Sequence, residues 1–178
     1  MTYEVDDPVS GQRVVFHEPH PDALEVDLYV SPGAYVRDHL HPSQHETFTA
    51  VEGTFYPDVD GQRRTVGPGE SMTVPPRTKH GFRPAPEPVH LRVTIAPALR
   101  LEQYFRAFLG LSRDHRLSIP PDGIPKPVLQ MAVIMDEFKA EIAVPGLPLP
   151  VQRPMWWLLA QLGALKGFRR RLPEYGVF

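Results

Sequence analysis

The segment 33–53 concentrates side chains of the kinds that bind metal ions. His39 and His41 are two residues apart, so in a β-strand both side chains project to the same face. Glu46 follows after the short stretch 42–45, where we expect a turn that leads into the returning strand of a hairpin. Imidazole and carboxylate groups placed together in this way are typical ligands of divalent transition metals.

A further ligand is available from the stretch VPPRTKHGF, in which His80 stands at the start of a later predicted strand. Three imidazoles and one carboxylate suit Fe, Mn, Ni, Cu, Co or Zn and leave one or two coordination positions open. A histidine is more often an ordinary surface or core residue, so His39, His41 and Glu46 alone leave both interpretations open. By alternation His45 points away from Glu46, and we expect it at the rim or surface.

The composition narrows the range of function. The chain has 178 residues, a formal net charge of −2 and no cysteine, which excludes thiolate sites and gives no indication of a nucleic-acid partner. The N-terminus is acidic and lacks the pattern of a signal peptide, so we expect a cytoplasmic protein. No apolar run approaches the roughly 18 residues of a membrane span.

The elements that must position these residues change character near residue 97. Short alternating segments between Gly/Pro turns predict antiparallel strands before it, and apolar residues at helical spacing predict about three helices after it. We therefore expect a mainly β domain at 1–97 and a helical extension at 98–178 packed on it. The predicted strands are 12–16, 23–30, 35–41, 46–53, 70–76 and 89–96, and the predicted helices are 98–111, 127–142 and 154–171, the last opening at Pro154.

The histidine segment resembles the first motif of the cupin family. That motif is a glycine, five residues, His-x-His, three or four residues, Glu, six residues and a glycine. Gly33, His39, His41, Glu46 and Gly53 match it in full.

The second cupin motif is matched in part. Gly69, Pro75 and His80 fit, whereas Arg77 stands in place of the usual glycine and Pro84 in place of the asparagine. These departures fall at turn and strand-end positions, where they affect loop shape more than metal binding. The resemblance implies a small antiparallel β-barrel of the cupin or jelly-roll type, with His39, His41, Glu46 and His80 around one metal ion inside it.

Strand alternation extends the prediction to the pocket around that metal. If His39 and His41 face inward, Tyr35 and Arg37 should do so too, and Phe48 and Phe82 should follow Glu46 and His80. These four residues are our candidates for substrate binding. Arg37 could meet a substrate carboxylate or enolate oxygen, or a strand bulge could turn it outward.

The predicted helices carry Met and aromatic residues that are most often core. Their alternative role is a lid over the barrel mouth. The last stretch places Lys166 and the run 169–171 beside an apolar segment. Such an end can bind an anionic membrane surface, or it can be an ordinary helix whose last turn carries positive charge.

The cupin resemblance implies a metal-dependent enzyme that acts on a small molecule. The apolar, aromatic pocket favours a hydrophobic or aromatic substrate. Of the reactions that the resemblance implies, we expect a dioxygenase-type oxidoreductase. The alternatives are an oxygen-independent isomerase, cyclase or lyase of polyketide-like metabolism, with Glu46 as a catalytic base, and a cupin that binds a ligand without turnover. The metal would be one Fe, Mn, Ni, Cu or Zn ion. We expect a homodimer formed through an open strand edge.

Overall fold

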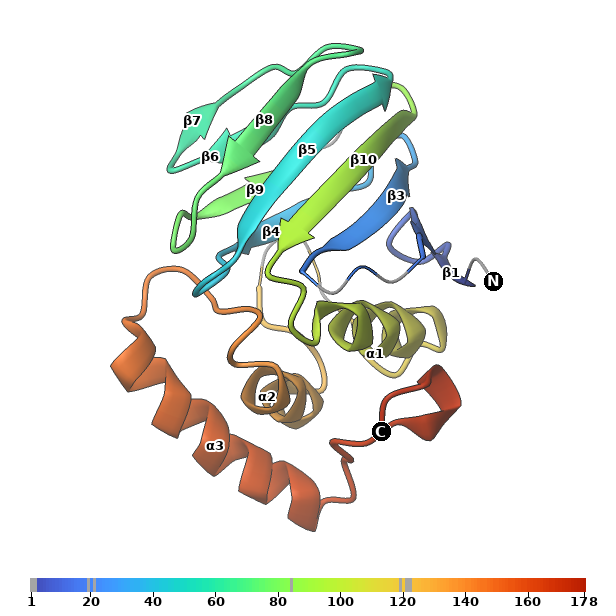
Figure 1. Ribbon diagram of the computed structural model, residues 1–178. Helices are drawn as coiled ribbons and strands as arrows, with labels where there is room; N and C mark the ends of the chain where they lie inside the picture. Colours follow the sequence, from blue (N-terminus) through green and yellow to red (C-terminus); the bar gives the residue numbers. More distant parts are fainter. Residues whose placement is uncertain (1–2, 19, 21, 84, 119, 121–122) are drawn as a thin grey trace.

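The strands form two antiparallel sheets that face each other, as the computed structural model in Figure 1 shows. It describes residues 3–18, 20, 22–83, 85–118, 120 and 123–178, and Pro84 of the second motif lies outside them. The larger sheet has the order β1 (Tyr3–Asp7), β2 (Gln12–Phe16), β3 (Leu24–Val30), β10 (Val89–Ala96), β5 (His45–Glu52) and β8 (Ser71–Val74). The smaller sheet has the order β4 (Val36–His39), β9 (His80–Phe82), β6 (Pro57–Val59) and β7 (Gln62–Arg63).

Alternation along the central strands builds the core between the two sheets. β3 and β10 pair in antiparallel register from Leu24 opposite Ile95 to Val30 opposite Val89, and every second residue of each strand is buried. An antiparallel sheet with one packed face shows this period of two. The mainly β prediction is confirmed, and the strands β2, β3, β5, β8 and β10 lie within about two residues of their predicted positions.

The hairpin expected on either side of residues 42–45 does not form. β4 pairs with β9 in the smaller sheet, while β5 pairs with β10 and β8 in the larger one. The connecting stretch therefore crosses from one sheet to the other. As a result, Glu46 faces His39 across the barrel interior instead of lying beside it in one ladder.

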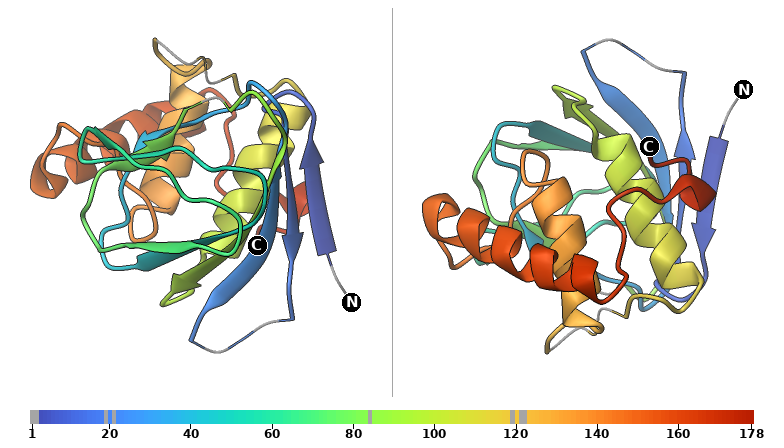
Figure 2. Two further views of the ribbon diagram at one scale, coloured as in Figure 1. Left: turned by 90° about the horizontal axis from the view of Figure 1, so that it is seen from above. Right: turned by 90° about the horizontal axis from the view of Figure 1, so that it is seen from below.

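Three helices follow the strands and lie together at one end of the barrel, as the view from below in Figure 2 shows. They are α1 (Leu101–Arg113), α2 (Val128–Glu137) and α3 (Leu149–Leu165), and a short 3-10 turn η1 (Pro173–Tyr175) ends the chain. α1 packs on β1 and β2, where the rings of Phe105 and Phe16 are 6.5 Å apart. α3 packs on α2 through Gly163, at which a Cβ atom would lie 2.8 Å from the Val133 side chain. None of the described helices is long and apolar enough to cross a membrane.

Three helix boundaries differ from the prediction by five or six residues, and one of them is the end of α3, which lies at Leu165 and not at residue 171. α3 begins at Leu149 and not near Pro154, because Pro150 lies in the first turn, where backbone N–H groups have no helical partner. Pro154 then lies inside the helix. α2 ends at Glu137 instead of residue 142, because the backbone of Ala143 forms a β-bridge with Leu40. The division into 1–97 and 98–178 stays a prediction.

Candidate metal centre

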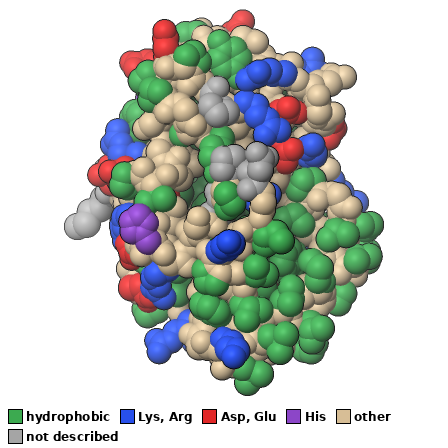
Figure 3. Space-filling model, turned by 180° about the vertical axis from the view of Figure 1, so that it is seen from behind, with side chains coloured by type: hydrophobic (Ala, Val, Ile, Leu, Met, Phe, Trp, Pro, Cys, Tyr) green, Lys and Arg blue, Asp and Glu red, His purple; other side chains and the backbone are tan. Residues whose placement is uncertain are grey.

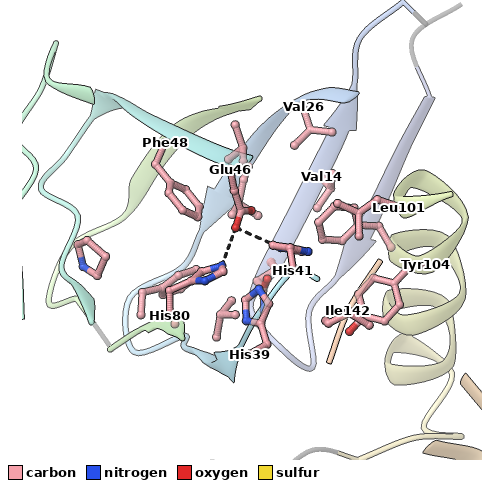
Figure 4. A pocket seen from close by; sticks show the side chains of 18 of the residues that line it. Val14, Val26, His39, His41, Glu46, Phe48, His80, Leu101, Tyr104 and Ile142 are labelled. Carbon is pink, nitrogen blue, oxygen red and sulfur yellow. Dashed lines mark hydrogen bonds and ion pairs between the residues drawn. The ribbon is translucent and has the colours of Figure 1, made fainter. Parts of the chain in front are cut away.

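Four side chains from three strands and one connecting segment meet inside the barrel. β4 and β9 pair with His39 directly opposite His80, and the centroids of these two rings are 4.3 Å apart. His41 lies just beyond β4, with its ring centroid 5.1 Å from that of His39. Glu46 reaches the same point from β5 in the facing sheet, as Figure 4 shows. One ligand atom from each of the four lies within 4.8 Å of the others.

Each of the three imidazole rings is held by a backbone carbonyl group. His39 Nδ1 lies 2.9 Å from the Arg37 oxygen and His80 Nδ1 lies 2.9 Å from the Thr78 oxygen. His41 Nδ1 lies 2.6 Å from the oxygen of Glu141. A carbonyl oxygen only accepts hydrogen bonds, so each Nδ1 carries a proton, and in the neutral form of each ring the lone pair is on Nε2. Histidines that bind metals are commonly oriented in this way.

Two of the Nε2 atoms converge on one carboxylate oxygen. His80 Nε2 lies 2.7 Å from Glu46 Oε2 and donates a hydrogen bond to it in the imidazolium form, in which Nε2 also carries a proton. His41 Nε2 lies 3.3 Å from the same oxygen as an ion pair without hydrogen-bond geometry, so this buried nitrogen has no hydrogen-bond partner. Buried polar atoms nearly always have a partner, and one without a partner calls for an explanation. A bound cation would supply that partner.

The charges of the cluster shift the pKa values of its members in opposite directions. Burial alone would raise the pKa of Glu46, but the adjacent imidazole groups of His41 and His80 hold it well below the usual range. Burial also works against the charged form of His41, yet the neighbouring carboxylate of Glu46 raises the pKa of His41. Burial, together with the other two histidines, lowers the pKa of His39 to about 3.

The donor set fits a divalent transition metal. Three imidazole nitrogens and one carboxylate oxygen suit Fe, Mn, Ni, Cu or Zn, and such a set does not by itself select among them. The anchored rings present their lone pairs inward, and the pKa of His39 leaves that ring neutral at physiological pH. His39, His41, Glu46 and His80 would be the ligands.

A cavity opens beside this cluster and is lined largely by apolar side chains. Its volume is about 60 Å³, whereas one water needs about 10–15 Å³ by the same measure. The cavity therefore accommodates a few waters or a small organic group. Figure 4 shows Phe48 on the side of His80, with Leu101, Tyr104 and Ile142 across from it. Phe82 also lines the cavity.

The comparisons with known proteins agree with this geometry. A family model described as "Cupin domain" matches residues 27–95. Residues 27–95 form a cupin domain. No curated protein sequence matches the chain.

Solved structures of other cupins resemble the chain over a little more than half of its length. An RmlC-like cupin from Shewanella frigidimarina NCIMB 400 is 26% identical with a TM-score of 0.51, over 57% of this chain and 89% of that one. KdgF from Halomonas sp. is 22% identical with a TM-score of 0.49, over 53% and 86%. Pac13 from Streptomyces, described as a nucleoside dehydratase and solved with uridine, is 20% identical with a TM-score of 0.47, over 57% and 79%.

One departure from the second cupin motif has a visible structural cost. Arg77 has φ +63°, in the left-handed region that favours the glycine it replaces. Its backbone N–H donates to the oxygen of His41 at 2.8 Å, so this turn still holds the ligand-bearing segment. His45 is exposed, in accord with the alternation argument.

The cupin cavity does not include two of the four predicted substrate-binding residues. Phe48 and Phe82 line it, but Tyr35 and Arg37 do not. The pairing of β4 with β9 shifts register between Val36 and His39. Because of this irregularity, Val36 and His39 both line the cavity although they are three residues apart. Strict alternation therefore fails before His39, and Tyr35 and Arg37 are not among the residues that line the cavity. The substrate-binding role of Phe48 and Phe82 stays a prediction.

Arg37 contacts a loop outside the barrel interior. Its Nη1 atom donates to the backbone oxygen of Gly123 at 2.9 Å and to that of Pro120 at 3.4 Å. The guanidinium thus has acceptors outside the cavity. The hypothesis that Arg37 meets a substrate carboxylate is not supported.

Residues after the barrel complete the cavity wall. Leu101, Tyr104 and Phe105 come from α1 and Ile142 comes from the segment after α2. The helical spacing marks the α1 residues as one apolar face, but that spacing is equally typical of plain core. Tyr104 differs from its neighbours because it is buried and its hydroxyl has no hydrogen bond to another described residue. A buried tyrosine hydroxyl usually has a partner.

Proposed function

We propose that this cupin is a metal-dependent enzyme that acts on a small hydrophobic or aromatic molecule, as a dioxygenase-type oxidoreductase. One observation carries the proposal: three imidazole rings, each fixed at Nδ1 by a backbone carbonyl, converge beside Glu46 at the wall of an apolar cavity. A structural role for the barrel needs no such set. The metal would be Fe, Mn, Ni, Cu or Zn.

In such a reaction some residues of the chain would hold the metal and others would bind the substrate. A divalent transition metal held here supplies Lewis-acid polarisation of a substrate oxygen, and Fe, Mn, Ni or Cu also supplies electron chemistry with dioxygen. His39, His41 and His80 hold it, and Phe48 and Phe82 keep the site poor in water and pack against an apolar substrate. A low-dielectric surrounding strengthens the electrostatic interactions inside it.

The Tyr104 hydroxyl supports a small substrate with one polar oxygen. It lies on the wall facing the cluster and is free to donate a hydrogen bond. Burial raises the pKa of Tyr104 well above its usual range, so the group stays protonated at physiological pH. In this proposal Tyr104 orients the substrate by donating to its oxygen while the apolar walls hold the carbon skeleton.

The first test combines metal content with oxygen uptake. The untagged protein, purified without added metal, and the His80→Ala variant are analysed for metals, and the metal-loaded protein is screened with aromatic and diketone-like acids. We expect about one Fe, Mn, Ni or Cu per chain, a large loss of it in the variant, and oxygen consumption with at least one substrate. Absence of metal even after reconstitution would contradict the proposal.

A second candidate is an oxygen-independent isomerase, cyclase or lyase. It is favoured by the two proton-carrying groups on opposite walls, with Glu46 able to accept a proton and Tyr104 able to donate one. Stoichiometric zinc and turnover without oxygen would support this candidate over the dioxygenase. Binding of a hydrophobic acid without any change in it would instead indicate a ligand-binding cupin.

The expected assembly and location stay predictions. The homodimer predicted through an open strand edge would use β1 or β8 of the larger sheet, or β4 or β7 of the smaller one, since these are the edge strands. Sedimentation velocity of the purified protein tests it. The cytoplasmic location rests on the sequence alone.

A further inference from the structure

The outward face of α3 is apolar and exposed. Val151, Trp157, Leu158, Leu162 and Leu165 are between 47% and 84% exposed. Figure 3 shows hydrophobic side chains gathered at the lower right of the back face, where α3 lies in that view, with Lys and Arg side chains near the lower edge. Contiguous exposed apolar patches of this kind mark interaction sites.

Few residues of α3 are fully buried against the rest of the protein. Of the 17 residues of the helix, Gln152, Ala160 and Gly163 are buried, and the helix approaches α2 closely at Gly163. An ordinary surface helix keeps its apolar stripe inward and presents polar residues to water. α3 packs inward through Trp156 and the small residues Ala160 and Gly163, yet it also presents large apolar residues outward, so something else covers its outer face.

The charge around α3 indicates what that partner is. Residues 142–173 contain no Asp or Glu and five basic residues, namely Arg153, Lys166, Arg169, Arg170 and Arg171. This segment contributes +5 to a formal net charge of −2, so the rest of the chain carries −7. The segment with the exposed apolar helix therefore carries a net positive charge, whereas the rest of the chain is net negative.

Most of that positive charge is available to a partner. Arg170 is paired within the protein, with its Nη1 atom 2.5 Å from Asp136 Oδ2. Lys166, Arg169 and Arg171 are exposed, and none of them forms an ion pair within the part of the chain that the structure describes. They follow directly on the last turn of α3, beside the exposed Leu165.

We propose that α3 and residues 166–171 form a docking surface for an anionic phospholipid membrane. The helix lies in the plane of the interface, where Trp157, Leu158 and Leu162 enter the boundary between head groups and acyl chains. Lys166, Arg169 and Arg171 contact the anionic head groups. Interfacial helices combine an apolar face with Trp and Leu and adjoining basic residues in this way, and anionic leaflets attract such basic clusters. The negative remainder of the chain orients the barrel away from the bilayer.

A second copy of the chain fits the same surface less well. Pairing two outer faces of α3 about a twofold axis would bring two segments of charge +5 together. Like charges placed opposite each other oppose association. The apolar face would accept either partner, and the charge selects the lipid surface.

The test is sedimentation of the full-length protein with sucrose-loaded vesicles of phosphatidylcholine, with and without 30 mol% phosphatidylserine. We expect binding that rises at least tenfold with phosphatidylserine, weakens as NaCl is raised, and shifts the tryptophan emission of the protein to shorter wavelength. The charge variant R169Q/R171Q should lose at least tenfold in affinity. The matched variant R63Q/R64Q, which removes two exposed arginines from the region of β7, should change it less than twofold.

A second variant tests the apolar face without relying on charge. Leu158 and Leu162 are exposed, so L158Q/L162Q should keep the Tm and the metal content of the parent while losing vesicle binding. Equal binding to both vesicle types, or no binding, would overturn the proposal. A dimer seen by sedimentation velocity that L158Q/L162Q dissociates, without vesicle binding by the parent, would assign the face to a second copy instead.

Discussion

His41 Nδ1 lies 2.6 Å from the backbone oxygen of Glu141, a residue 100 positions later in the chain. This contact ties the candidate metal centre to the segment that follows α2. The same segment bridges to Leu40 through Ala143 and lines the cavity through Ile142. The part of the chain after the barrel therefore shapes the site, which makes it more than a cover for the sheets.

Removing the side chain of Glu141 should weaken metal binding indirectly. This buried carboxylate accepts the backbone N–H of Arg100 through Oε1 at 3.2 Å, which fixes the segment whose carbonyl orients His41. We expect Glu141→Ala to lower metal affinity about tenfold, as changes to such outer partners do. Glu141→Gln keeps an acceptor and should retain most of the affinity. Competition with a chelator measures both, and equal affinities in the two variants would contradict the positioning role.

Metal binding should release a proton near neutral pH. The pKa of His41 is raised above its ordinary value of 6.5, so the metal-free site still carries a proton there that a cation must displace. His39, with a pKa of about 3, contributes nothing in this range. The apparent affinity for Zn²⁺ should therefore rise between pH 6 and 8, by up to about tenfold per pH unit. Calorimetry in buffers of different ionisation enthalpy measures the number of protons released on Zn²⁺ binding. An affinity for Zn²⁺ that does not depend on pH would contradict the predicted proton release.

The stability of the metal-free protein should show the opposite trend above pH 6.5. A raised pKa for His41 means that its contribution to the free energy of unfolding is full below 6.5 and is lost as pH rises through the raised value. The lowered pKa of Glu46 gives a contribution that is present above 4.5 and is lost as pH falls. The pKa of His39 is lowered to about 3, so protonation of this residue in the unfolded chain also reduces stability as pH falls below 6.5. The chelated protein should accordingly have its highest Tm near pH 6.5, as thermal unfolding across pH would show, and His41→Ala should remove the decline above that pH.

Tyr104→Phe should separate catalysis from folding. The hydroxyl of Tyr104 makes no hydrogen bond to a described residue, so its removal should leave metal content and Tm unchanged. Turnover of the substrate found by screening should fall tenfold or more if the hydroxyl orients that substrate. Tyr175→Phe is the matched control. Its hydroxyl bonds to Asp114 Oδ2 at 2.7 Å, so it should lose about 1–3 kcal/mol of stability while keeping activity.

Gly81 is required by the close approach of β4 and β9. A Cβ atom there would lie 2.7 Å from the Val36 oxygen and 2.9 Å from the Asp38 nitrogen, both of them backbone atoms that cannot rotate away. We expect Gly81→Ala to cost about 1–3 kcal/mol and to weaken metal binding by separating His39 from His80. Gly67→Ala meets only the Glu70 side chain at 3.5 Å and should change stability by less than about 0.5 kcal/mol. Urea unfolding of both variants gives the comparison.

The sequence predicts the cluster because its spacing is local. His39 and His41 are separated by one residue, and Glu46 and His80 stand at fixed positions in two cupin motifs. Strand alternation and the motifs together therefore predict the four candidate metal ligands. Alternation failed where the ladder is irregular: the shift between Val36 and His39 leaves no mark in residue types, and it reversed the expectation for Arg37.

The contribution of the later segments could not be predicted from periodicity. Helical spacing marks Tyr104 as buried, but which surface it meets depends on contacts between residues far apart in the chain. The contact between His41 and Glu141 uses a backbone carbonyl, which carries no sequence signal at all. The start of α3 was missed because Pro150 reads as a helix breaker unless the helix is already known to begin beside it.

The most direct measurement of the central claim is anomalous diffraction at the absorption edge of the metal found in the untagged protein. We predict one anomalous peak per chain, bonded to the Nε2 atoms of His39, His41 and His80 and to a carboxylate oxygen of Glu46. A peak elsewhere, or a metal that leaves any of the three Nε2 atoms unbound, would contradict this account of the site.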